Sequence, residues 1–343
     1  MPVTLAQPED WTEPGAHPVA RGIYRVPLPL PLFGLTAINA YILEGRDGLI
    51  VIDPGWAGPE NERAMSAALR TIGYRLNDIE ACLSTHHHGD HFSQAFAWRG
   101  SLGSKLYTGR EERHSLASFP TAVGRFPNHP PLLDRCGAPE LARRIAGKAS
   151  DAWHNTAFGM PDGWLDNGDV IRLRKGSLQV IATPGHTRGH IVLHEPVTRL
   201  LFSGDHILPH ITPSIGIEWA PERYPLRSYL QSLELVRGLP DTALLPAHGP
   251  VTCSTNARIT ELLQHHRERL DEVCELVAAG HTTAYQVARS MPWTRRGRRW
   301  EQLPVEHQLC AVMEISAHLD VLAMHGRLHH DDSAAARHYA LAG

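Results

Sequence analysis

A dense group of metal-binding side chains directly behind an apolar segment constrains the fold of this chain more than any other feature. Residues 79–83 (IEACL) have the mostly apolar character of a buried strand. Residues 86–91 (HHHGDH) follow closely and lead into a predicted helix over 92–98. Because the chain holds 23 histidines among 343 residues, a single histidine carries little information, and the argument depends on spacing.

The spacing within HHHGDH predicts two neighbouring metal positions. Side chains two apart on an extended segment point the same way, so His86 and His88 can reach one ion together. Beyond the bend at the following glycine, Asp90 and His91 can face a second ion. His87 lies between two ligands and is expected to point away, as a structural or a solvated residue.

Three further segments place a histidine or an aspartate where a predicted strand ends beside proline or glycine. They are TPGHT with His186, FSGD with Asp205, and LPAHG with His248. Asp53 in VIDPG stands in the same kind of position. Tight turns at the ends of a rigid sheet hold side chains in fixed directions, and imidazole with carboxylate suits zinc, manganese or iron(II). The sequence therefore predicts a metal site at one edge of a sheet.

The order of predicted elements favours sheets packed on each other with helices outside, rather than a regularly alternating parallel sheet. Helical patterns cover residues 59–71, 92–98 and 225–238. Strand patterns cover residues 37–53, 79–83, 104–108, 169–182, 190–205 and 242–249.

Two regions depart from this pattern. Residues 110–165 lack strand alternation, with a second helix near 138–150, and we interpret them as an insertion that forms a lid or a substrate wall. After residue 255 the pattern is helical over 257–279, 284–291 and 305–325. Together with a closing Gly-Arg-Leu turn, these helices have the outline of a small winged-helix module.

The segments VIDPG, HxHxDH, TPGHT, SGD and PAHG, in this order, resemble the metallo-β-lactamase superfamily of hydrolases over about residues 20–255. The helical region behind them resembles, by shape and position, the winged-helix appendage of β-lactamase-like hydrolases allied to glyoxalase II. The resulting expectation is an α/β fold, an αββα sandwich over 1–255 that contains the insertion, then a winged-helix-like domain over 256–330 and a tail over 331–343.

The resemblance also implies roles for the site residues. The first ion would be held by His86, His88 and His186, and the second by Asp90, His91 and His248, with Asp205 bridging both. As catalytic residues we expect Asp90, which would accept or relay a proton, and Asp53, which would fix a ligand loop by hydrogen bonds. The cofactors would be two divalent metal ions, Zn²⁺ first, with Mn²⁺ or Fe²⁺ as alternatives.

These roles predict a hydrolase that uses a metal-bridging hydroxide to cleave a small ester, thioester or lactone. A phosphodiesterase or nuclease is the alternative. A true β-lactamase is less favoured, because the β-lactam-specialised enzymes of the superfamily lack a carboxylate at the SGD position. A DNA-binding regulator without activity is disfavoured by the complete ligand set.

Composition sets the expected surroundings. The formal net charge of −3 provides no basic field for nucleic acid, which stays a disfavoured partner behind a small-molecule substrate. No apolar run approaches the roughly 20 residues of a membrane helix. The five cysteines form no CxxC pair, so we expect a soluble cytoplasmic protein with reduced thiols, with a homodimer through the C-terminal helices as an option.

Several other residues invite a functional role that we discount. The arginines of TRRGRRW, with Trp293 and Trp300 as stacking surfaces, could contact nucleic acid, but we expect packing or substrate access instead. His190 is expected to hydrogen-bond near the site without binding metal. His206 could equally line the pocket or pack under it. The loop from His210 to Trp219 borders the substrate as a weak pocket candidate. The pairs His265-His266 and His329-His330 are expected on solvated surfaces.

Overall fold

The computed structural model describes residues 9–32, 35–119, 126–147, 158–293 and 297–343. A first sheet holds seven strands in chain order. Strands β1 to β4 are antiparallel, and β5, β6 and β7 continue parallel to β4. The strands are β1 (His17–Ala20), β2 (Ile23–Leu32), β3 (Leu35–Glu44), β4 (Leu49–Ile52), β5 (Ile79–Ser84), β6 (Lys105–Gly109) and β7 (Gly163–Leu165).

A second sheet of five strands has the order β12-β11-β10-β9-β8, antiparallel except for the parallel pair β11–β12. Its strands are β8 (Val170–Arg172), β9 (Ser177–Ala182), β10 (Ile191–Glu195), β11 (Leu200–Gly204) and β12 (Ala243–Pro246). Tyr41 and Leu43 of the first sheet share one buried cluster with Val180 and Phe202 of the second, so the two sheets pack face to face.

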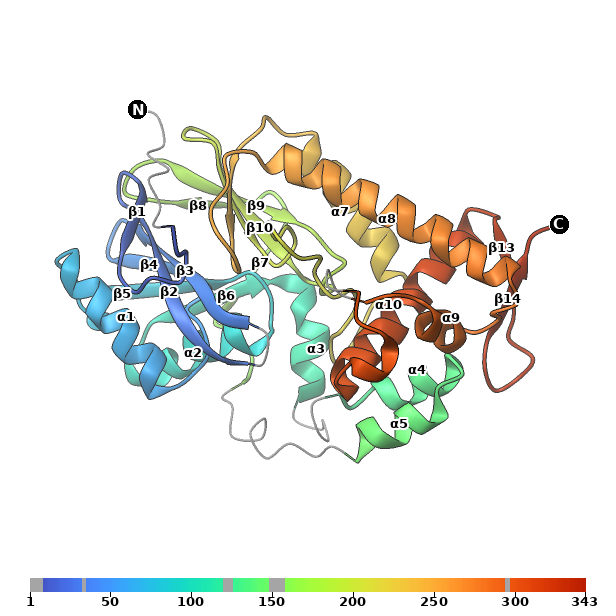
Figure 1. The fold of residues 1–343 in the computed structure, drawn as a ribbon. Coiled ribbons are helices and arrows are strands. Elements are labelled where there is room, and N and C mark those ends of the chain that lie inside the picture. Colours follow the sequence, from blue (N-terminus) through green and yellow to red (C-terminus); the bar gives the residue numbers. More distant parts are fainter. Residues whose placement is uncertain (1–8, 33–34, 120–125, 148–157, 294–296) are drawn as a thin grey trace.

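Helices cover the outer faces of both sheets (Figure 1). On the first sheet, α1 (Pro59–Thr71) and α2 (Gly89–Ser101) pack against alternate β3 residues such as Ile38 and Ile42. On the second, α7 (Pro225–Arg237) and α8 (Thr255–Ala278) pack against Val192 and Leu201. Both faces of the central strands are therefore buried, which explains their nearly continuous apolar sequences. The expected layers of helix, two sheets and helix are confirmed.

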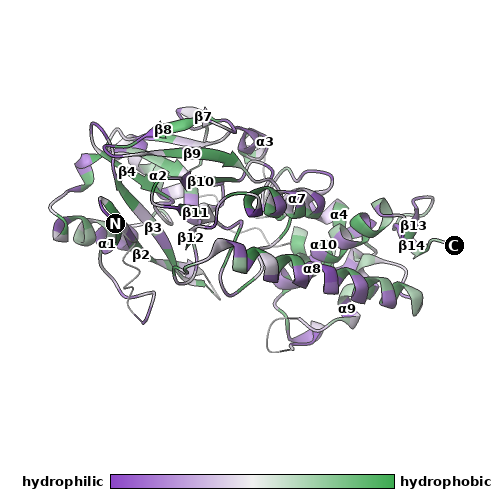
Figure 2. Ribbon diagram, turned by 90° about the horizontal axis from the view of Figure 1, so that it is seen from above, coloured by the Kyte–Doolittle hydropathy of each residue, from purple (hydrophilic) through white to green (hydrophobic). Residues whose placement is uncertain are grey.

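The C-terminal region adds α9 (Ala284–Ser290), α10 (Val305–Met324) and a hairpin of β13 (Leu328–Asp331) and β14 (His338–Leu341). Residues 331–343, which the sequence suggested to be a tail, thus include a paired strand, and Tyr339 on it is buried. Figure 2 shows hydrophobic and hydrophilic colours alternating around the turns of α8, as expected for a helix with one buried face. No described helix is long and apolar enough to cross a membrane.

The described residues of the region 110–165 are mostly helical, with a 3₁₀ turn at Arg110–Glu112 and the helices α3 (Arg113–Ser118), α4 (His129–Arg135) and α5 (Pro139–Ala146). It differs from the expectation in one respect, because its last residues form strand β7 beside β6. Helices α4 and α5 pack on α10 and share its buried cluster. This region therefore links the sandwich to the C-terminal helices.

One expectation about the C-terminal side chains is wrong. His266 is buried, and its Nδ1 lies 3.2 Å from Nε2 of His318, so it is not on a solvated face. Trp293 and Trp300 are also buried, and Trp293 donates its indole N–H to the Ala288 carbonyl. These rings fill the core and are not available to stack on bases. Residues 294–296, which include two of the four arginines of TRRGRRW, lie outside the described residues.

Candidate metal centre

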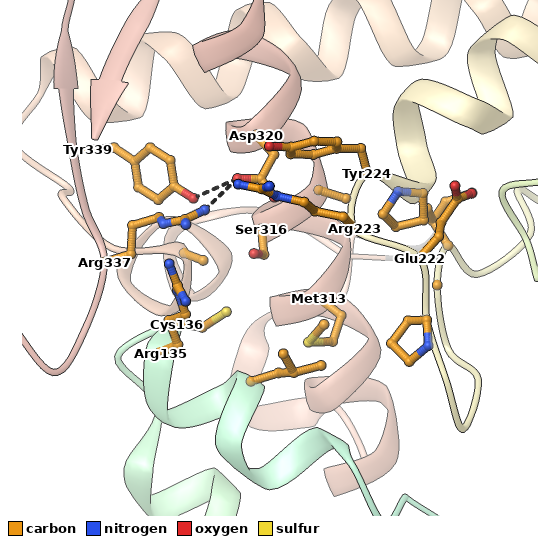
Figure 3. Close-up of a pocket in the computed structure, with 17 residues that line it drawn as sticks. Arg135, Cys136, Glu222, Arg223, Tyr224, Met313, Ser316, Asp320, Arg337 and Tyr339 are labelled. Carbon is orange, nitrogen blue, oxygen red and sulfur yellow. Dashed lines mark hydrogen bonds and ion pairs between the residues drawn. The ribbon is translucent and has the colours of Figure 1, made fainter. Parts of the chain in front are cut away.

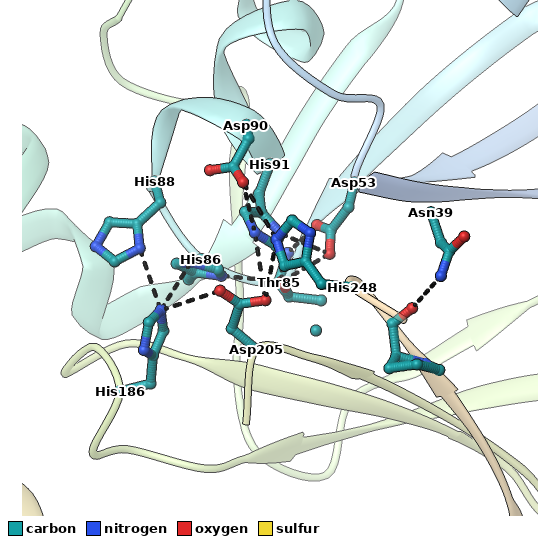
Figure 4. Close-up of polar contacts among 12 residues, drawn as sticks. Asn39, Asp53, Thr85, His86, His88, Asp90, His91, His186, Asp205 and His248 are labelled. Atoms are coloured by element: carbon teal, nitrogen blue, oxygen red, sulfur yellow. Dashed lines mark hydrogen bonds and ion pairs between the residues drawn. The ribbon is translucent and has the colours of Figure 1, made fainter. Parts of the chain in front are cut away.

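All seven predicted ligands meet at one edge of the sandwich, where strands from both sheets end (Figure 4). The β5 end and the first turn of α2 supply four of them, and the turns after β9, β11 and β12 supply one each. In chain order they are His86, His88, Asp90, His91, His186, Asp205 and His248. All are buried except His88, which is partly exposed.

The first group of donor atoms is centred on Nε2 of His186. This atom lies 3.2 Å from Nε2 of His86 and 3.1 Å from Nδ1 of His88. It lies 3.5 Å from Oδ2 of Asp205. Three neutral imidazole nitrogens and a carboxylate oxygen this close together repel one another through their lone pairs unless a cation or a proton lies between them. The donor set suits a divalent ion such as zinc.

The second group is centred on Nε2 of His248, which lies 3.3 Å from Oδ2 of Asp90 and 3.5 Å from Oδ1 of Asp205. Nε2 of His91 lies 3.7 Å and 3.6 Å from the same two oxygens. Nε2 of His91, Nε2 of His248 and Oδ1 of Asp205 are buried without a hydrogen-bond partner among the described residues. Such orphaned atoms are costly unless something binds them, so this group also fits a metal ion.

Main-chain carbonyl groups fix the direction of three of these rings. In each case one ring nitrogen donates to a carbonyl oxygen, so the other nitrogen presents its lone pair to the site. The bonds run from His186 Nδ1 to Ser214 at 2.7 Å, from His88 Nε2 to Ile217 at 2.9 Å, and from His248 Nδ1 to Ala37 at 2.9 Å. The segment 210–219, expected to border the substrate, thus holds two of the ligand rings in place.

Asp53 contacts a ligand and a ligand-bearing loop without being one of the seven predicted ligands. Its oxygens accept hydrogen bonds from the main-chain N–H and the hydroxyl of Thr85, both at 2.8 Å. Oδ2 also lies 2.9 Å from Nδ1 of His91. The backbone of Asp53 has a φ of 49°, a left-handed conformation that aspartate tolerates better than most residues. Asp53 therefore contacts the ring of His91 and the residue before His86, and its role in the reaction stays a prediction.

Burial and mutual contact shape the charges of the cluster. Burial lowers the pKa of His88 and of His186 to about 3, so both rings stay neutral and keep a lone pair for a metal. Burial also opposes a charge on His91, but the carboxylates of Asp53, Asp90 and Asp205 outweigh it and raise its pKa to about 10. Without a metal, the second group thus holds a proton on His91 that a bound cation would displace.

His87 is structural, because it is buried and its Nδ1 contacts Oε2 of Glu112. The other oxygen of Glu112 accepts a hydrogen bond from the hydroxyl of Thr187, the residue after His186. Nearby, Glu218 accepts hydrogen bonds from Ser115 at 2.9 Å and from the main chain of Arg188 at 2.8 Å. Sequence reasoning missed both glutamates, since they come from segments that carry no ligand.

The other histidines near the centre have separate roles. Nδ1 of His190 pairs with the hydroxyl of Thr183 at 2.9 Å, and Nε2 accepts the Asp205 N–H at 3.2 Å, so both ring nitrogens are engaged within the protein. His206 is buried with its ring edge-to-face on Tyr229, 5.2 Å between centroids, which places it under the site. His210 is exposed.

Close packing explains the glycine in TPGHT. Gly185 has a φ of +138°, and a Cβ placed there would lie 2.4 Å from the Cβ of Tyr229 on α7. A larger residue would therefore push α7 away from the turn that carries His186. The proline-glycine turn fixes this ligand by contact with a helix as well as by its own geometry.

Comparison with known proteins agrees with the geometry. Residues 33–248 match the Metallo-beta-lactamase superfamily. The chain belongs to this superfamily. The "Probable metallo-hydrolase YqjP" of Bacillus subtilis (strain 168) is 27% identical over 310 residues, covering 87% of this chain and 90% of that protein. This superfamily member is accordingly a metal-dependent hydrolase, and its His/Asp cluster offers donor atoms close enough together to hold metal ions.

Two further relatives extend the comparison. The "Hydroxyacylglutathione hydrolase" of Aeromonas salmonicida (strain A449) is 29% identical over 205 residues, 60% of this chain and 58% of that protein. The crystal structure of a "Beta-lactamase domain protein" from Burkholderia ambifaria has a TM-score of 0.80 and 26% identity, covering 98% of both chains. The likeness to the Burkholderia structure therefore includes the C-terminal helices as well as the metallo-β-lactamase sandwich.

Proposed function

We propose that this chain is a dinuclear hydrolase that cleaves a small ester, thioester or lactone. The position of Asp205 carries the proposal, since Oδ2 faces the first donor group and Oδ1 faces the second. A single carboxylate shared in this way can hold two cations side by side. In this assignment the first ion is bound by His86, His88 and His186, and the second by Asp90, His91 and His248.

The two cations would supply a nucleophile from water at neutral pH and polarise the scissile carbonyl group. The protein's own residues keep this chemistry in place. The carbonyl groups of Ser214 and Ile217 hold the rings of His186 and His88. Burial would raise the pKa of Asp90, but His91 and His248 hold it well below its usual range. Asp90 therefore stays ionised and orients or relays a proton without storing it.

A thioester is the first of the three substrate classes to test. Support comes from the relative named hydroxyacylglutathione hydrolase, whose similarity covers 60% of this chain. Zinc is the first metal to test, because three imidazoles and a carboxylate form a donor set that zinc prefers, with manganese and iron(II) as alternatives that depend on supply.

The decisive experiment is a hydrolysis panel on the zinc- or manganese-loaded protein. It covers acyl thioesters, aryl esters and lactones, with a bis-aryl phosphodiester, RNA and a penicillin as contrasts. Asp205→Asn, which removes the shared negative charge, should abolish the activity. Asp47→Asn changes an exposed carboxylate of the β3–β4 turn and serves as the matched control. Turnover of the phosphodiester or RNA alone would replace the proposal by the phosphodiesterase alternative.

We also propose a non-catalytic role for the C-terminal region. Helices α8 to α10 with the β13–β14 hairpin would form a winged-helix-like module that closes one side of the substrate site and does not read nucleic acid. The buried positions of Trp293 and Trp300 support this proposal. The apolar side chains of α10, such as Leu309 and Ile315, are buried within the chain itself, so they do not require a second copy. A homodimer stays a prediction.

A further inference from the structure

A pocket of about 340 Å³ lies between the insertion, the segment 215–225 and the C-terminal region (Figure 3). Its walls come from α4, from the segment 215–225, from the start of α9, from α10, and from β14 with the residue before it. It contains none of the metal ligands. Its volume lies within the range of small-molecule sites, which begins at about 300 Å³.

The pocket has an apolar interior. It is lined by Leu132 of α4, by Ile215, by Pro225 at the start of α7, and by Met313 and Ala317 of α10. Alkyl and thioether groups of this kind bind the hydrocarbon part of a ligand and offer it no hydrogen bonds.

Arginines surround this apolar interior, and two of the three are already paired. Arg135 and Arg337 both contact Asp332, at 2.8 and 2.6 Å. Arg337 also contacts Asp320 at 2.9 Å. Arg223 differs from them, because within the described residues it has no ion pair, and its guanidinium lies 5.0 Å from the ring centre of Tyr224. Figure 3 shows Arg223 extending across the pocket towards Asp320.

Two acidic residues, Glu222 and Asp320, also line the pocket. Burial raises the pKa of both Glu222 and Asp320, which favours their neutral forms. One carboxyl oxygen of Glu222, Oε1, is buried without a hydrogen-bond partner among the described residues. A polar group of a ligand would satisfy it, and a protonated Glu222 could donate a hydrogen bond to an anion.

The wall of the pocket is also part of the metal centre. Ile215 and Gly216 line the pocket, while the carbonyl groups on either side of them, from Ser214 and Ile217, hold the rings of His186 and His88. The main-chain N–H of Gly216 donates to the carbonyls of Gly185 at 3.2 Å and His186 at 3.3 Å. A ligand in the pocket therefore touches a segment that orients two metal ligands.

We propose that this pocket binds a small carboxylate with an apolar body, the carboxylate on Arg223 and the body against Met313 and Ala317. The binding itself is independent of the hydrolase assignment, whereas its effect on turnover rests on the proposed function. The carboxylate could belong to a separate ligand or to the far end of the substrate, and the chemistry of recognition is the same.

Isothermal titration of the 343-residue chain, as purified, with octanoate tests the binding. Octanoate should bind one to one, and Arg223→Ala should weaken it about tenfold or more, as expected for loss of a charge-assisted hydrogen bond. Arg70→Ala removes an exposed arginine of α1 that does not line the pocket, and should change nothing. Met313→Trp, which fills the pocket, should abolish binding, while octan-1-ol should bind more weakly than octanoate and be insensitive to Arg223→Ala.

Octanoate could also bind the metals, and the variants separate the two sites. Arg223→Ala and Met313→Trp leave every metal ligand in place, so octanoate affinity that is equal in wild type and both variants would overturn the proposal, as would absence of binding at millimolar octanoate. If octylamine bound as tightly as octanoate, the proposal that the pocket prefers a negatively charged ligand would be overturned.

Turnover of a thioester in the presence of octanoate then shows whether the carboxylate that the pocket binds belongs to the substrate or to a separate ligand. Competition that raises KM indicates the far end of the substrate, and a change in kcat without competition indicates a separate ligand. If no substrate of the panel is turned over, the proposed function fails, while the titration still decides the binding site.

Discussion

Glu112, at the start of the insertion, accepts a hydrogen bond from Nδ1 of His87, the residue between the ligands His86 and His88. The same carboxylate accepts a hydrogen bond from Thr187, which follows the ligand His186. One buried side chain thus connects the two loops that form the first donor group. A backbone contact reinforces this connection, since a Cβ on Gly189 would lie only 2.0 Å from the main-chain nitrogen of Glu112.

His87→Ala should destabilise the protein, although His87 is not a ligand. The substitution leaves the Glu112 carboxylate buried without its partner, a loss that costs about 3 kcal/mol or more in comparable buried pairs. It should also weaken metal affinity by about 10–100-fold, as for other residues that orient ligands. Urea unfolding of the chelator-treated protein and zinc titration measure the two effects. His329→Ala, at an exposed strand position, is the control. Equal stability and equal zinc affinity of the two variants would contradict the role of the His87–Glu112 contact in holding the ligand loops.

Asp205→Ala should lower the metal content from about two ions per chain to one at most, and reduce kcat/KM by about a hundredfold or more. The carboxylate faces both donor groups, and no other described carboxylate in the site touches both. Elemental analysis after zinc supplementation gives the stoichiometry. Circular dichroism should be unchanged. Wild-type protein that holds a single ion under the same conditions would show that the centre is mononuclear.

The seven candidate ligands could be selected from the sequence because each follows a strand that the local pattern reveals. HHHGDH, for example, follows β5 and includes the first three residues of α2, and Asp205 directly follows β11. What the sequence could not give is the coordinating nitrogen, since His88 presents Nδ1 and His186 presents Nε2. That choice depends on the carbonyl groups of Ser214 and Ile217, more than 25 residues and more than 100 residues further along the chain, respectively.

The elements that sequence reasoning missed have tertiary causes. Strand β2 carries prolines at alternate positions, which argue against a strand, but β1 pairs only with Ile23 to Arg25. Beyond that point one side of β2 is an edge, so its prolines need no donor there. Strand β14 follows a charged loop, and it is identified only by its pairing with β13 and the burial of Tyr339. Glu112 gives no local signal, because its partners lie 25 and 75 residues away.

The stability of the metal-free protein should be greatest near pH 6.5 and fall on either side. Burial lowers the folded pKa of His88 and His186 to about 3 from 6.5, so the unfolded chain binds protons first as the pH falls, and acid destabilises the fold. Each such histidine contributes a slope of about 1.4 kcal/mol per pH unit. His91 acts oppositely. Burial lowers its pKa, but Asp53, Asp90 and Asp205 raise it to about 10, so its stabilisation is complete below 6.5 and is lost as the pH rises through about 10.

Urea unfolding in the presence of a chelator, at several pH values between 4 and 9, measures how the free energy of unfolding depends on pH. His186→Ala should reduce the loss of stability below pH 6.5, because the variant has one fewer neutral buried ring to protonate on unfolding. His210→Ala, which changes an exposed histidine, should leave the pH dependence of stability unchanged both below and above pH 6.5. Stability that is independent of pH over this range would mean that the rings are accessible to protons in the folded protein.

Hydrolysis of β-lactam antibiotics should be weak or absent, with a kcat/KM far below the 10⁶ M⁻¹s⁻¹ or so of efficient enzymes. Asp205 supplies a negative charge between the two donor groups, which the β-lactam-specialised members of the superfamily lack at this position. Phe119 of the insertion contacts the Trp219 ring at 5.0 Å between centroids, and Trp219 lies 5.1 Å from the His87 ring, so aromatic side chains pack beside the first donor group. Benzylpenicillin and a carbapenem should be assayed with the zinc-loaded protein alongside the best thioester. Efficient turnover of either drug, abolished by Asp205→Asn, would place this chain among the β-lactamases despite its carboxylate.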